Sequence, residues 1–323
     1  MKTKSFLING GGWVTNIGNG FLDIGTMGAI KLACPESNLY LNSVLNRWVI
    51  SSFNKTIFSK ILKIDPSNIF NIQYYCKVDY VVQSGAFLGN DWLNTHGKIL
   101  SYFSKKGVKI ILIGGGMTDS GYNTSVEKNR SYVESLKPFI FISRDKPSYD
   151  AFKDIADHSY NGIDCAFFLK DAYSPAQLDL PPYIIFNFDK QAEPKLESID
   201  CPVNMPIVHL HHSFWHKFSF TKTYKMFKEY YSKSNFMISE LPYDYLNLYA
   251  NASATYSDRV HACVASISYG RPAQLFSKSQ RAFLFDRLNM SAISKKLIKP
   301  DINLIEKEKT KQINFLSEII NNC

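Results

Sequence analysis

Short apolar runs that end in glycine recur along the first half of this chain. Three such segments are Ser5–Gly12, Tyr80–Gly85 and Ile110–Gly116. Amphipathic stretches of helical length separate them. Alternation of strand, glycine turn and helix is typical of a doubly wound, mostly parallel α/β sheet. In such sheets ligands bind beyond the carboxyl ends of the strands, so we expect the functional residues at these turns.

The expected elements divide into two α/β units. The first has strands at Ser5–Asn9, Asn38–Leu41, Tyr80–Gln83, Ile110–Ile113 and Phe139–Ile142. The second has strands at Tyr183–Phe188, Pro206–Leu210, Phe236–Ile238, Ala254–Ser257 and Ala273–Phe276. The intervening helices are expected at Gly20–Ala33, Trp92–Lys105, Lys128–Leu136, Lys222–Tyr231 and Asp244–Ala250, with another after Pro147.

We therefore predict two Rossmann-like domains that face each other across a cleft. The N-terminal domain covers 1–175 and the C-terminal domain 176–301. A charged helix within 302–323 is expected to pack back on the N-terminal domain. The segment 171–182 is rich in Pro, Ala and Asp, and we interpret it as the linker.

Charge and composition narrow the classes of partner. The formal net charge of +9 favours an anionic partner, which could be a phosphorylated substrate, an anionic membrane surface or nucleic acid. Nucleic acid is not expected, because no RNP-like or zinc-finger pattern occurs. No apolar run reaches the roughly 18 residues of a membrane-spanning helix. The N-terminal apolar stretch is too short for a signal peptide, so we expect a cytoplasmic protein.

One late segment carries the strongest chemical signal. Val260, Cys263, Val264 and Ile267 have the spacing of a buried helix face, and Gly270 can end that helix. Ser257 or Asp258 is expected to cap its start. Arg259 and His261 then lie in the first helical turn, where backbone N–H groups favour an anion. The alternative is a pair of solvated side chains without function.

Two charged residues of the first domain are further candidates. Arg144 follows a strand directly, a position suited to bidentate binding of a carboxylate or phosphate. The alternative for Arg144 is a salt bridge with Asp145 or Asp150. Asp164 enters an apolar segment, where it could be a base or ligand-binding group at the cleft, or equally a helix cap.

Glycines and histidines supply the remaining candidates. The loop Gly10–Gly20 follows the first strand and would let backbone N–H groups approach a phosphate or sugar, although it lacks a P-loop lysine. The segment His209–His216 holds four of the seven histidines. No acidic or cysteine partner stands at familiar spacing, so we expect no metal. His211 is better suited to proton transfer or to hydrogen bonding with a sugar.

Taken together, these motifs resemble the polysaccharide pyruvyltransferase family. The early matches are Asn16–Gly20, Val81–Gly85, Ile111–Gly116, Ser143–Asp145 and Asp164. The most specific match is Ala254–Ala262 with Gly270-Arg271-Pro272, after which Arg281 stands in place of the family's lysine. The chain also departs from the family pattern at Asn19 and Val260.

The resemblance implies a GT-B-like fold that binds phosphoenolpyruvate between its domains and needs no other cofactor. The implied reaction transfers pyruvyl to two hydroxyls of a sugar, forming a ketal and releasing phosphate. The sugar would belong to a surface polysaccharide or a lipid-linked oligosaccharide, which would bring the enzyme to the inner face of the membrane. The implied catalytic residues are His261 and Asp164. Substrate binding would fall to Arg144, Arg259, Arg281, Asn16, Gly18, Gly85 and His211.

Two alternatives remain open at this point. A GT-B glycosyltransferase would use a nucleotide sugar and needs a carboxylate for the ribose and a site for the base. A non-catalytic basic module would show no turnover, and its binding would fall steeply with salt.

Overall fold

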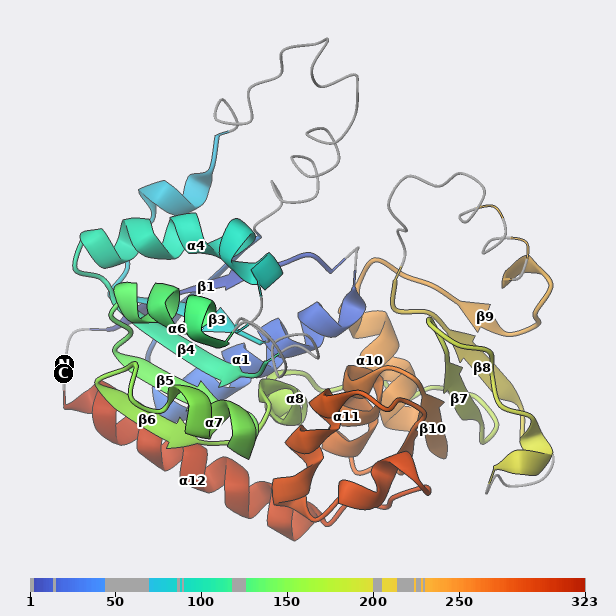
Figure 1. The fold of residues 1–323 in the computed structure, drawn as a ribbon. Coiled ribbons are helices and arrows are strands. Elements are labelled where there is room, and N and C mark those ends of the chain that lie inside the picture. The colour runs from blue at the N-terminus through green and yellow to red at the C-terminus, as the bar shows by residue number, and fades with distance from the viewer. Residues whose placement is uncertain are drawn as a thin grey trace.

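The computed structural model of the chain describes residues 3–13, 16–43, 70–85, 88, 90–117, 126–199, 205–213, 224, 228 and 230–322. Within them the fold is α/β, with two parallel sheets side by side (Figure 1). This confirms the predicted fold class. No helix in these ranges is long and apolar enough to cross a lipid bilayer.

The first sheet has six parallel strands in the order β2-β1-β3-β4-β5-β6. Their bounds are β1 Ser5–Gly10, β2 Asn38–Ser43, β3 Tyr80–Ser84, β4 Lys109–Gly115, β5 Ile140–Ser143 and β6 His158–Asn161. The order changes direction at β1, since β2 and β3 pair with its two sides. A crevice forms at the carboxyl ends of the strands where such a change occurs.

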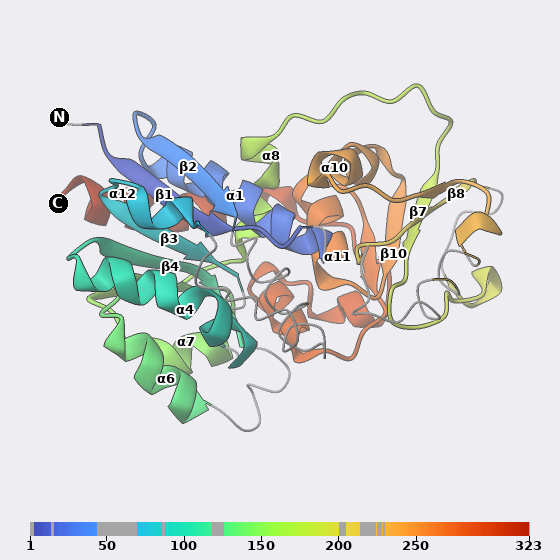
Figure 2. The same ribbon diagram turned by 90° about the horizontal axis from the view of Figure 1, so that it is seen from above.

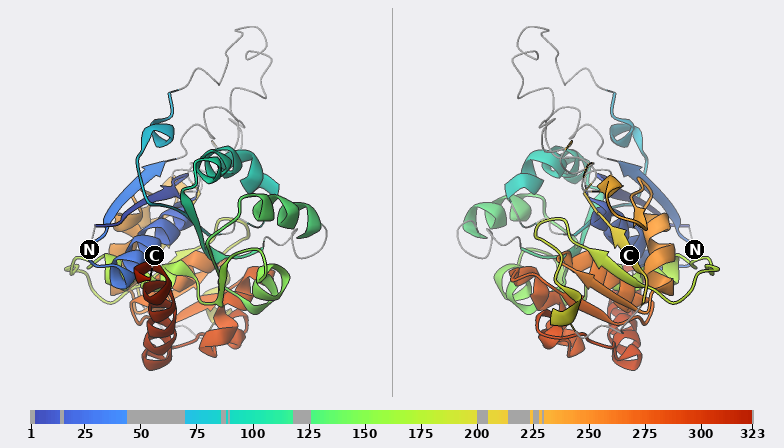
Figure 3. Two further views of the ribbon diagram at one scale, coloured as in Figure 1. Left: turned by 90° about the vertical axis from the view of Figure 1, so that its left-hand side faces the viewer. Right: turned by 90° about the vertical axis from the view of Figure 1, so that its right-hand side faces the viewer.

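Both faces of this sheet are covered by helices, which explains the continuous apolar runs in its strands. Alternate strand residues point to opposite faces. The covering helices are α1 Ile17–Ala33, α4 Asn90–Lys105, α6 Val126–Ser135, α7 Lys146–Phe152 and α12 Ile302–Asn321. Apolar residues of α4, α6 and α7 form one buried cluster with the strands, and residues of α1 and α12 form another on the opposite face (Figure 3).

The second sheet has five parallel strands in the order β11-β10-β7-β8-β9. Their bounds are β7 Ile184–Asn187, β8 Ile207–Leu210, β9 Phe236–Met237, β10 Ala254–Ser257 and β11 Ala273–Leu275. Two helices, α10 Pro242–Asn251 and α11 Val260–Ser268, flank it. The helix predicted over Lys222–Tyr231 lies largely outside the described residues.

Helix α1 touches both units (Figure 2). It packs against the short helices η3 Cys165–Phe168 and α8 Leu169–Ala172 and against α10 and α11. The approach is close because Gly25 faces the Cys165 carbonyl, where a methyl group would overlap it. At its start, the Ile17 N–H donates to the His212 carbonyl at 2.9 Å. Helix α1 therefore belongs structurally to both halves.

The C-terminal helix α12 lies along α1 and β6. Phe315 stacks on Tyr160 with ring centroids 4.9 Å apart. Gln312 accepts a 2.8 Å hydrogen bond from the Ile163 N–H. The chain therefore returns from the second sheet to the first before it ends.

Two of the differences between the described elements and the sequence prediction have a clear physical cause. Strand β6 was not predicted, because its sequence His-Ser-Tyr-Asn lacks an apolar run; it is an edge strand and only partly buried. Helix α1 begins at Ile17 rather than Gly20, because the Asn16 side chain caps it by accepting from the Gly18 N–H.

Candidate functional site

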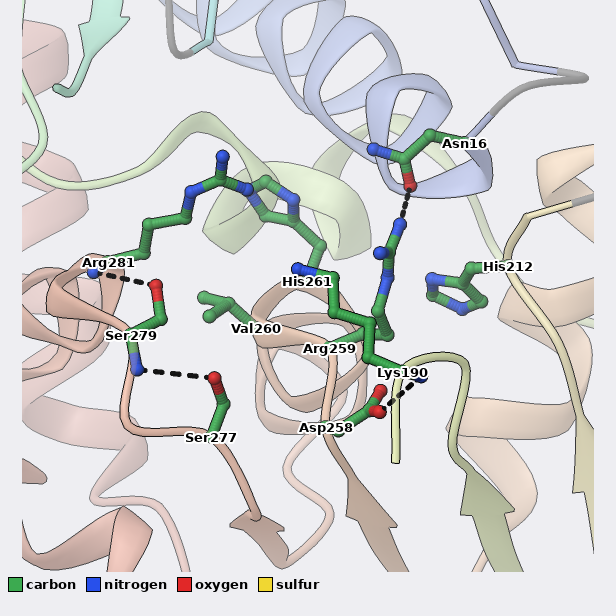
Figure 4. A pocket seen from close by; sticks show the side chains of 10 residues that line it. All are labelled: Asn16, Lys190, His212, Asp258, Arg259, Val260, His261, Ser277, Ser279 and Arg281. Carbon is green, nitrogen blue, oxygen red and sulfur yellow. Dashed lines mark hydrogen bonds between the residues drawn. The ribbon is translucent and has the colours of Figure 1, made fainter. Parts of the chain in front are cut away.

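A basic pocket lies where the start of α1 meets the carboxyl edge of the second sheet (Figure 4). It encloses about 380 Å³, part of which is open solvent. The residues that line it are Asn16, Lys190, His212, Asp258, Arg259, Val260, His261, Ser277, Ser279 and Arg281. Three cationic side chains thus face one carboxylate, which makes the pocket suited to an anion.

Arg259 and His261 lie at the start of α11, as predicted. The prediction that Ser257 or Asp258 caps this helix is wrong. Arg259 is itself the N-cap residue, and no side chain caps the helix. Ser257 instead accepts from the Arg259 N–H at 2.9 Å. Asp258 turns to the loop after β7, where its carboxylate accepts from three successive backbone N–H groups, those of residues 189–191. The helix start therefore faces the pocket uncapped.

Asp258 thereby holds Lys190 at the pocket. The Lys190 N–H donates to Asp258 at 2.7 Å, and Lys190 contributes to the pocket wall. Neither residue was predicted as a site residue. Both follow the carboxyl end of a strand, β10 and β7, so the rule that pointed to Arg144 could have found them.

Arg259 connects the two halves of the protein at this pocket. Its Nη2 donates to Oδ1 of Asn16 at 2.7 Å (Figure 4), and its Nε lies 3.4 Å from Asp189. Asp189 is almost fully buried and also accepts from the His212 N–H. The guanidinium is therefore fixed in position before any ligand arrives.

His261 lies against a buried ion pair formed by Asp164 and Arg144. Nη1 of Arg144 donates to Oδ2 of Asp164 at 3.1 Å, and Nε2 of His261 lies 3.6 Å from the same oxygen. The side chain of His261 is 13% exposed and opens to the pocket, whereas that of Asp164 is 0% exposed. The structure thus brings all three predicted residues together, with His261 at the pocket and the ion pair behind it.

Asp164 takes one of its two expected roles, whereas the partner of Arg144 was not expected. The Asp164 carboxylate also accepts from the Ala166 N–H, so it caps η3, one of the two expected alternatives. Arg144 pairs with Asp164 at 3.1 Å and approaches Asp145 only to 4.0 Å. Its side chain is 1% exposed and does not line the pocket. Gly116 lies against the guanidinium, where a methyl group would overlap Nε.

These contacts determine the protonation states of Asp164 and His261. Burial raises the pKa of Asp164, but contact with His261 and the charge of Arg144 outweigh it, and the pKa is about 2. Burial lowers the pKa of His261, and the positive charges of Arg144 and Arg281 lower it further against the attraction of Asp164. Arg144 and the Ala166 N–H keep Asp164 ionised even beside a neutral imidazole. His261 is therefore mainly neutral near pH 7.

Of the other predicted residues, Gly18 and Arg281 lie at the site. A methyl group on Gly18 would lie 3.1 Å from Nδ1 of His261, so this glycine contacts the imidazole directly. Arg281 lines the pocket beside His261 (Figure 4). Gly85 does not line it: its backbone has φ +86°, and it packs against Leu22 of α1.

His212, rather than His211, lines the pocket. Nε2 of His211 lies 3.6 Å from Asp189, and its ring packs on Tyr230. His212 is fully buried, and its Nε2 contacts the Tyr249 hydroxyl at 2.7 Å. Its Nδ1 has no hydrogen-bond partner among the described residues. Burial and the charge of Arg259 lower the pKa of His212 well below its usual range, so the ring is neutral.

The histidines of the H-x-H-H motif point to separate partners. His209 contacts Glu193 at 2.9 Å, while His211 and His212 face Asp189 and Tyr249. In the part of the chain that the structure describes, no three His, Cys, Asp or Glu side chains gather in the manner of metal ligands.

Two Rossmann-like units with an anion pocket between the start of α1 and the second sheet define a GT-B-like protein. The model of the polysaccharide pyruvyl transferase family matches residues 29–277. The chain belongs to this family and is therefore a transferase, which sets aside the alternative of a non-catalytic basic module.

Solved structures of other proteins share the fold. UDP-N-acetylglucosamine 2-epimerase from Rickettsia bellii matches with a TM-score of 0.54 and 14% identity, over 99% of this chain and 95% of that one. The Methanocaldococcus jannaschii UDP-GlcNAc 2-epimerase in complex with UDP-GlcNAc and UDP matches with a TM-score of 0.52 and 14% identity, over 98% of each chain. At such identity the likeness concerns the fold alone. No curated protein matches the sequence.

Proposed function

We propose that this transferase moves pyruvyl from phosphoenolpyruvate to two hydroxyls of a sugar, forming a cyclic ketal and releasing phosphate. The observation that carries the proposal is the placement of His261 among three cations. A proton donor and an anion site are what enol protonation of a phosphorylated carboxylate requires.

Phosphoenolpyruvate suits the pocket by charge. Its phosphate and carboxylate would be bound by Arg259, Arg281 and Lys190, which line one small volume. Arg259 is held by Asn16 and Asp189, so little side-chain entropy is lost on binding.

In the proposed reaction His261 transfers a proton to the methylene carbon of phosphoenolpyruvate. The double-bond electrons form the new C–H bond, and the central carbon becomes electrophilic. One sugar hydroxyl adds to that carbon and returns its proton to the now neutral His261. A second hydroxyl then displaces phosphate, which leaves with the remaining proton, and the ketal ring closes.

Binding of the anion would itself prepare the acid. Burial and the positive charges of Arg144 and Arg281 lower the pKa of His261 in the empty site. A bound anion opposes the effect of those charges and favours the imidazolium. Asp164 and Arg144 are buried behind the ring and would act as positioning residues, with Asp164 orienting His261.

A nucleotide-sugar donor is the second candidate, because the Methanocaldococcus epimerase of the same fold is in complex with UDP-GlcNAc and UDP. The family match favours pyruvyl transfer. Thermal stabilisation by phosphoenolpyruvate, compared with UDP- and CMP-sugars, tests the donor. We expect a shift with phosphoenolpyruvate and phosphate only. A shift confined to a nucleotide sugar would overturn the proposal.

The acceptor we propose is a sugar of a surface polysaccharide or its lipid-linked precursor. The net charge of +9 would favour contact of the cytoplasmic enzyme with an anionic membrane surface. Sedimentation with vesicles of anionic and of neutral lipid tests this contact. We expect binding to the anionic vesicles alone, weakened by salt.

A further inference from the structure

The positive charge of this chain is concentrated in one stretch. Residues 271–299 hold seven lysines and arginines and a single acidic residue, Asp286. Seven positive charges less one negative leave +6, out of +9 for the whole chain. Two of these cations are already engaged, since Arg281 lines the basic pocket and Arg287 pairs with Glu308 at 3.0 Å. The lysines of the stretch are Lys278, Lys295, Lys296 and Lys299.

All four lysines are exposed, and none of them forms an ion pair within the described residues. The next acidic residue along the chain, Asp301, caps helix α12 by accepting from the Leu304 N–H at 3.0 Å. Lysines scattered over a surface ordinarily serve solubility. A row of unpaired lysines along one element is different, because their charges add at one place.

The four lysines follow the outer strand of the second sheet. Strand β11 lies at the edge of that sheet, and Ala273 at its start pairs with Ile298 in an antiparallel bridge. Lys299 therefore lies beside the beginning of β11. The antiparallel direction leads Lys295 and Lys296 toward its end, and Lys278 follows that end directly. We call these four lysines the basic edge.

The basic edge reaches the rim of the basic pocket. Lys278 stands between Ser277 and Ser279, both of which line the pocket (Figure 4). The Ser279 N–H donates to the Ser277 hydroxyl at 3.2 Å and closes the turn around Lys278. A body that contacts the basic edge thus comes next to the opening of the pocket.

The composition of the edge indicates what it contacts. None of the four lysines lines the basic pocket, so they form a row on the surface and not a cavity for one small anion. All are lysines, which meet phosphate groups as point charges without the bidentate geometry that arginine offers to nucleic acid. The neighbouring Ile302 is 38% exposed and lies against Gly270, just before β11. Lysines beside an exposed apolar residue are suited to anionic lipid headgroups.

We propose that the basic edge docks this protein onto an anionic lipid surface, with the basic pocket next to that surface. The inference names the surface for the membrane contact proposed above. It rests on the proposed function only in that a lipid-linked acceptor would then reach the pocket directly from the bilayer.

Sedimentation of the full chain with vesicles of phosphatidylglycerol, and with vesicles of phosphatidylcholine, tests the inference. One variant combines Lys278→Gln, Lys295→Gln, Lys296→Gln and Lys299→Gln. The matched control combines Lys77→Gln, Lys98→Gln, Lys105→Gln and Lys153→Gln, which removes the same charge from four exposed lysines of the first unit. Calorimetry with inorganic phosphate, in the absence of vesicles, reports on the pocket separately.

We expect the unmodified protein to bind the phosphatidylglycerol vesicles and not the phosphatidylcholine vesicles. Each lysine near an anionic lipid surface strengthens binding about fivefold. The partition coefficient should therefore fall at least about twentyfold in the basic-edge variant and stay within about threefold in the control. The Kd for phosphate should stay within about twofold in all three proteins, because none of the replaced lysines lines the pocket.

Equal losses of vesicle binding in the two variants would overturn the inference and leave a membrane contact that depends on net charge alone. No vesicle binding by the unmodified protein would overturn it as well, and retention on poly-glutamate in that case would identify an acidic protein as the partner. Phosphate release from phosphoenolpyruvate with a water-soluble sugar needs no lipid, so pyruvyl transfer is judged independently of these outcomes.

Discussion

Nη2 of Arg259 donates a 2.7 Å hydrogen bond to Oδ1 of Asn16, a residue 243 positions earlier in the chain. The same Asn16 oxygen accepts from the Gly18 N–H at the start of α1. The first turn of the first helix is thus bonded to the cation of the second unit. The same guanidinium thus lines the pocket and contributes one of the contacts between the two halves.

Arg259→Ala should abolish most of the anion affinity. We expect the Kd for inorganic phosphate to rise at least about tenfold, because hydrogen bonds to a charged group contribute about 1.5–3 kcal/mol. Isothermal calorimetry measures it. Arg271→Ala is the matched control, since Arg271 is an exposed arginine of the same unit that donates to the Ala250 carbonyl. Equal phosphate affinity in both variants would contradict our assignment of Arg259.

His261→Gln should bind phosphoenolpyruvate and fail to convert it. Glutamine keeps a polar side chain of similar reach but cannot donate a proton to carbon. We expect kcat to fall by about 10²–10⁴, the usual contribution of a general acid, with the Kd for phosphoenolpyruvate changed less than about threefold. Phosphate release and calorimetry measure the two quantities. Full turnover in this variant would show that the proton comes from elsewhere.

Phosphate should raise the pKa of His261. In the free protein burial and the charges of Arg144 and Arg281 lower it below 6.5. An anion bound beside the ring favours the charged imidazole, so the pKa rises on binding. NMR titration of the imidazole resonances with and without phosphate measures the shift, and exposed His158 on β6 is the internal reference. A fall in the pKa on phosphate binding would contradict the mechanism.

The protonation state of His261 should also determine how kcat depends on pH. In the proposed mechanism the imidazolium is the acid, so kcat should decline as the pH rises through the pKa of His261 in the complex. A kcat that increases steadily across this range would require a neutral His261 in the first step.

Gly116→Ala should disrupt the ion pair behind His261. The added methyl group would overlap Nε of the buried Arg144 and displace it from Asp164. We expect stability to fall by about 3 kcal/mol, typical of a broken buried pair, and kcat to fall with it. Urea unfolding and phosphate release measure both.

Gly107→Ala is the control for that variant. Gly107 has φ +74° and nothing within 4 Å of an added methyl group. Its substitution should lower stability by about 1 kcal/mol through backbone strain while leaving kcat unchanged. If Gly116→Ala also kept its kcat, the position of Arg144 would not matter for catalysis.

Asp164→Asn should destabilise the protein in a pH-dependent way. The folded pKa of Asp164 is about 2, below its ordinary value of 3.8. A lowered carboxyl pKa contributes stability that is present above the unfolded value and lost as the pH falls toward the folded value. We expect a deficit of about 2 kcal/mol above pH 4 that shrinks between pH 4 and pH 2. Urea unfolding across this range, with exposed Asp157→Asn as control, measures it; a constant deficit would contradict the assignment.

The sequence sufficed for every described strand except β6 and for part of the pocket lining. Apolar runs such as Ile110–Ile113 could be recognised because parallel strands covered on both faces are continuously apolar. The placement of functional residues at strand ends led to Arg144 and to Arg259 with His261. Strand β6 was not predicted because its residues are polar and are covered by helix α12. A contact between segments so distant in the sequence leaves no local pattern.

The partners of the site residues could not be predicted in the same way. Asp164 caps η3 and Arg144 follows β5, so their contact depends on tertiary packing between two separate elements. Asp258 was expected to cap helix α11. Its carboxylate instead accepts hydrogen bonds from three backbone N–H groups of the loop after β7. Likewise, His212 rather than His211 faces the pocket, because the side chain of His211 contacts Asp189 and packs on Tyr230.

The position of α1 across both halves bears on how the two halves are held together. Its glycines let the helix backbone touch η3, its first N–H bonds to the His212 carbonyl, and Asn16 holds Arg259. The coil 174–182 is thus one of several connections between the halves, and the return of the chain from the second sheet into α12 is another. A protease cut within this coil should leave two fragments that elute as one particle and still bind phosphate.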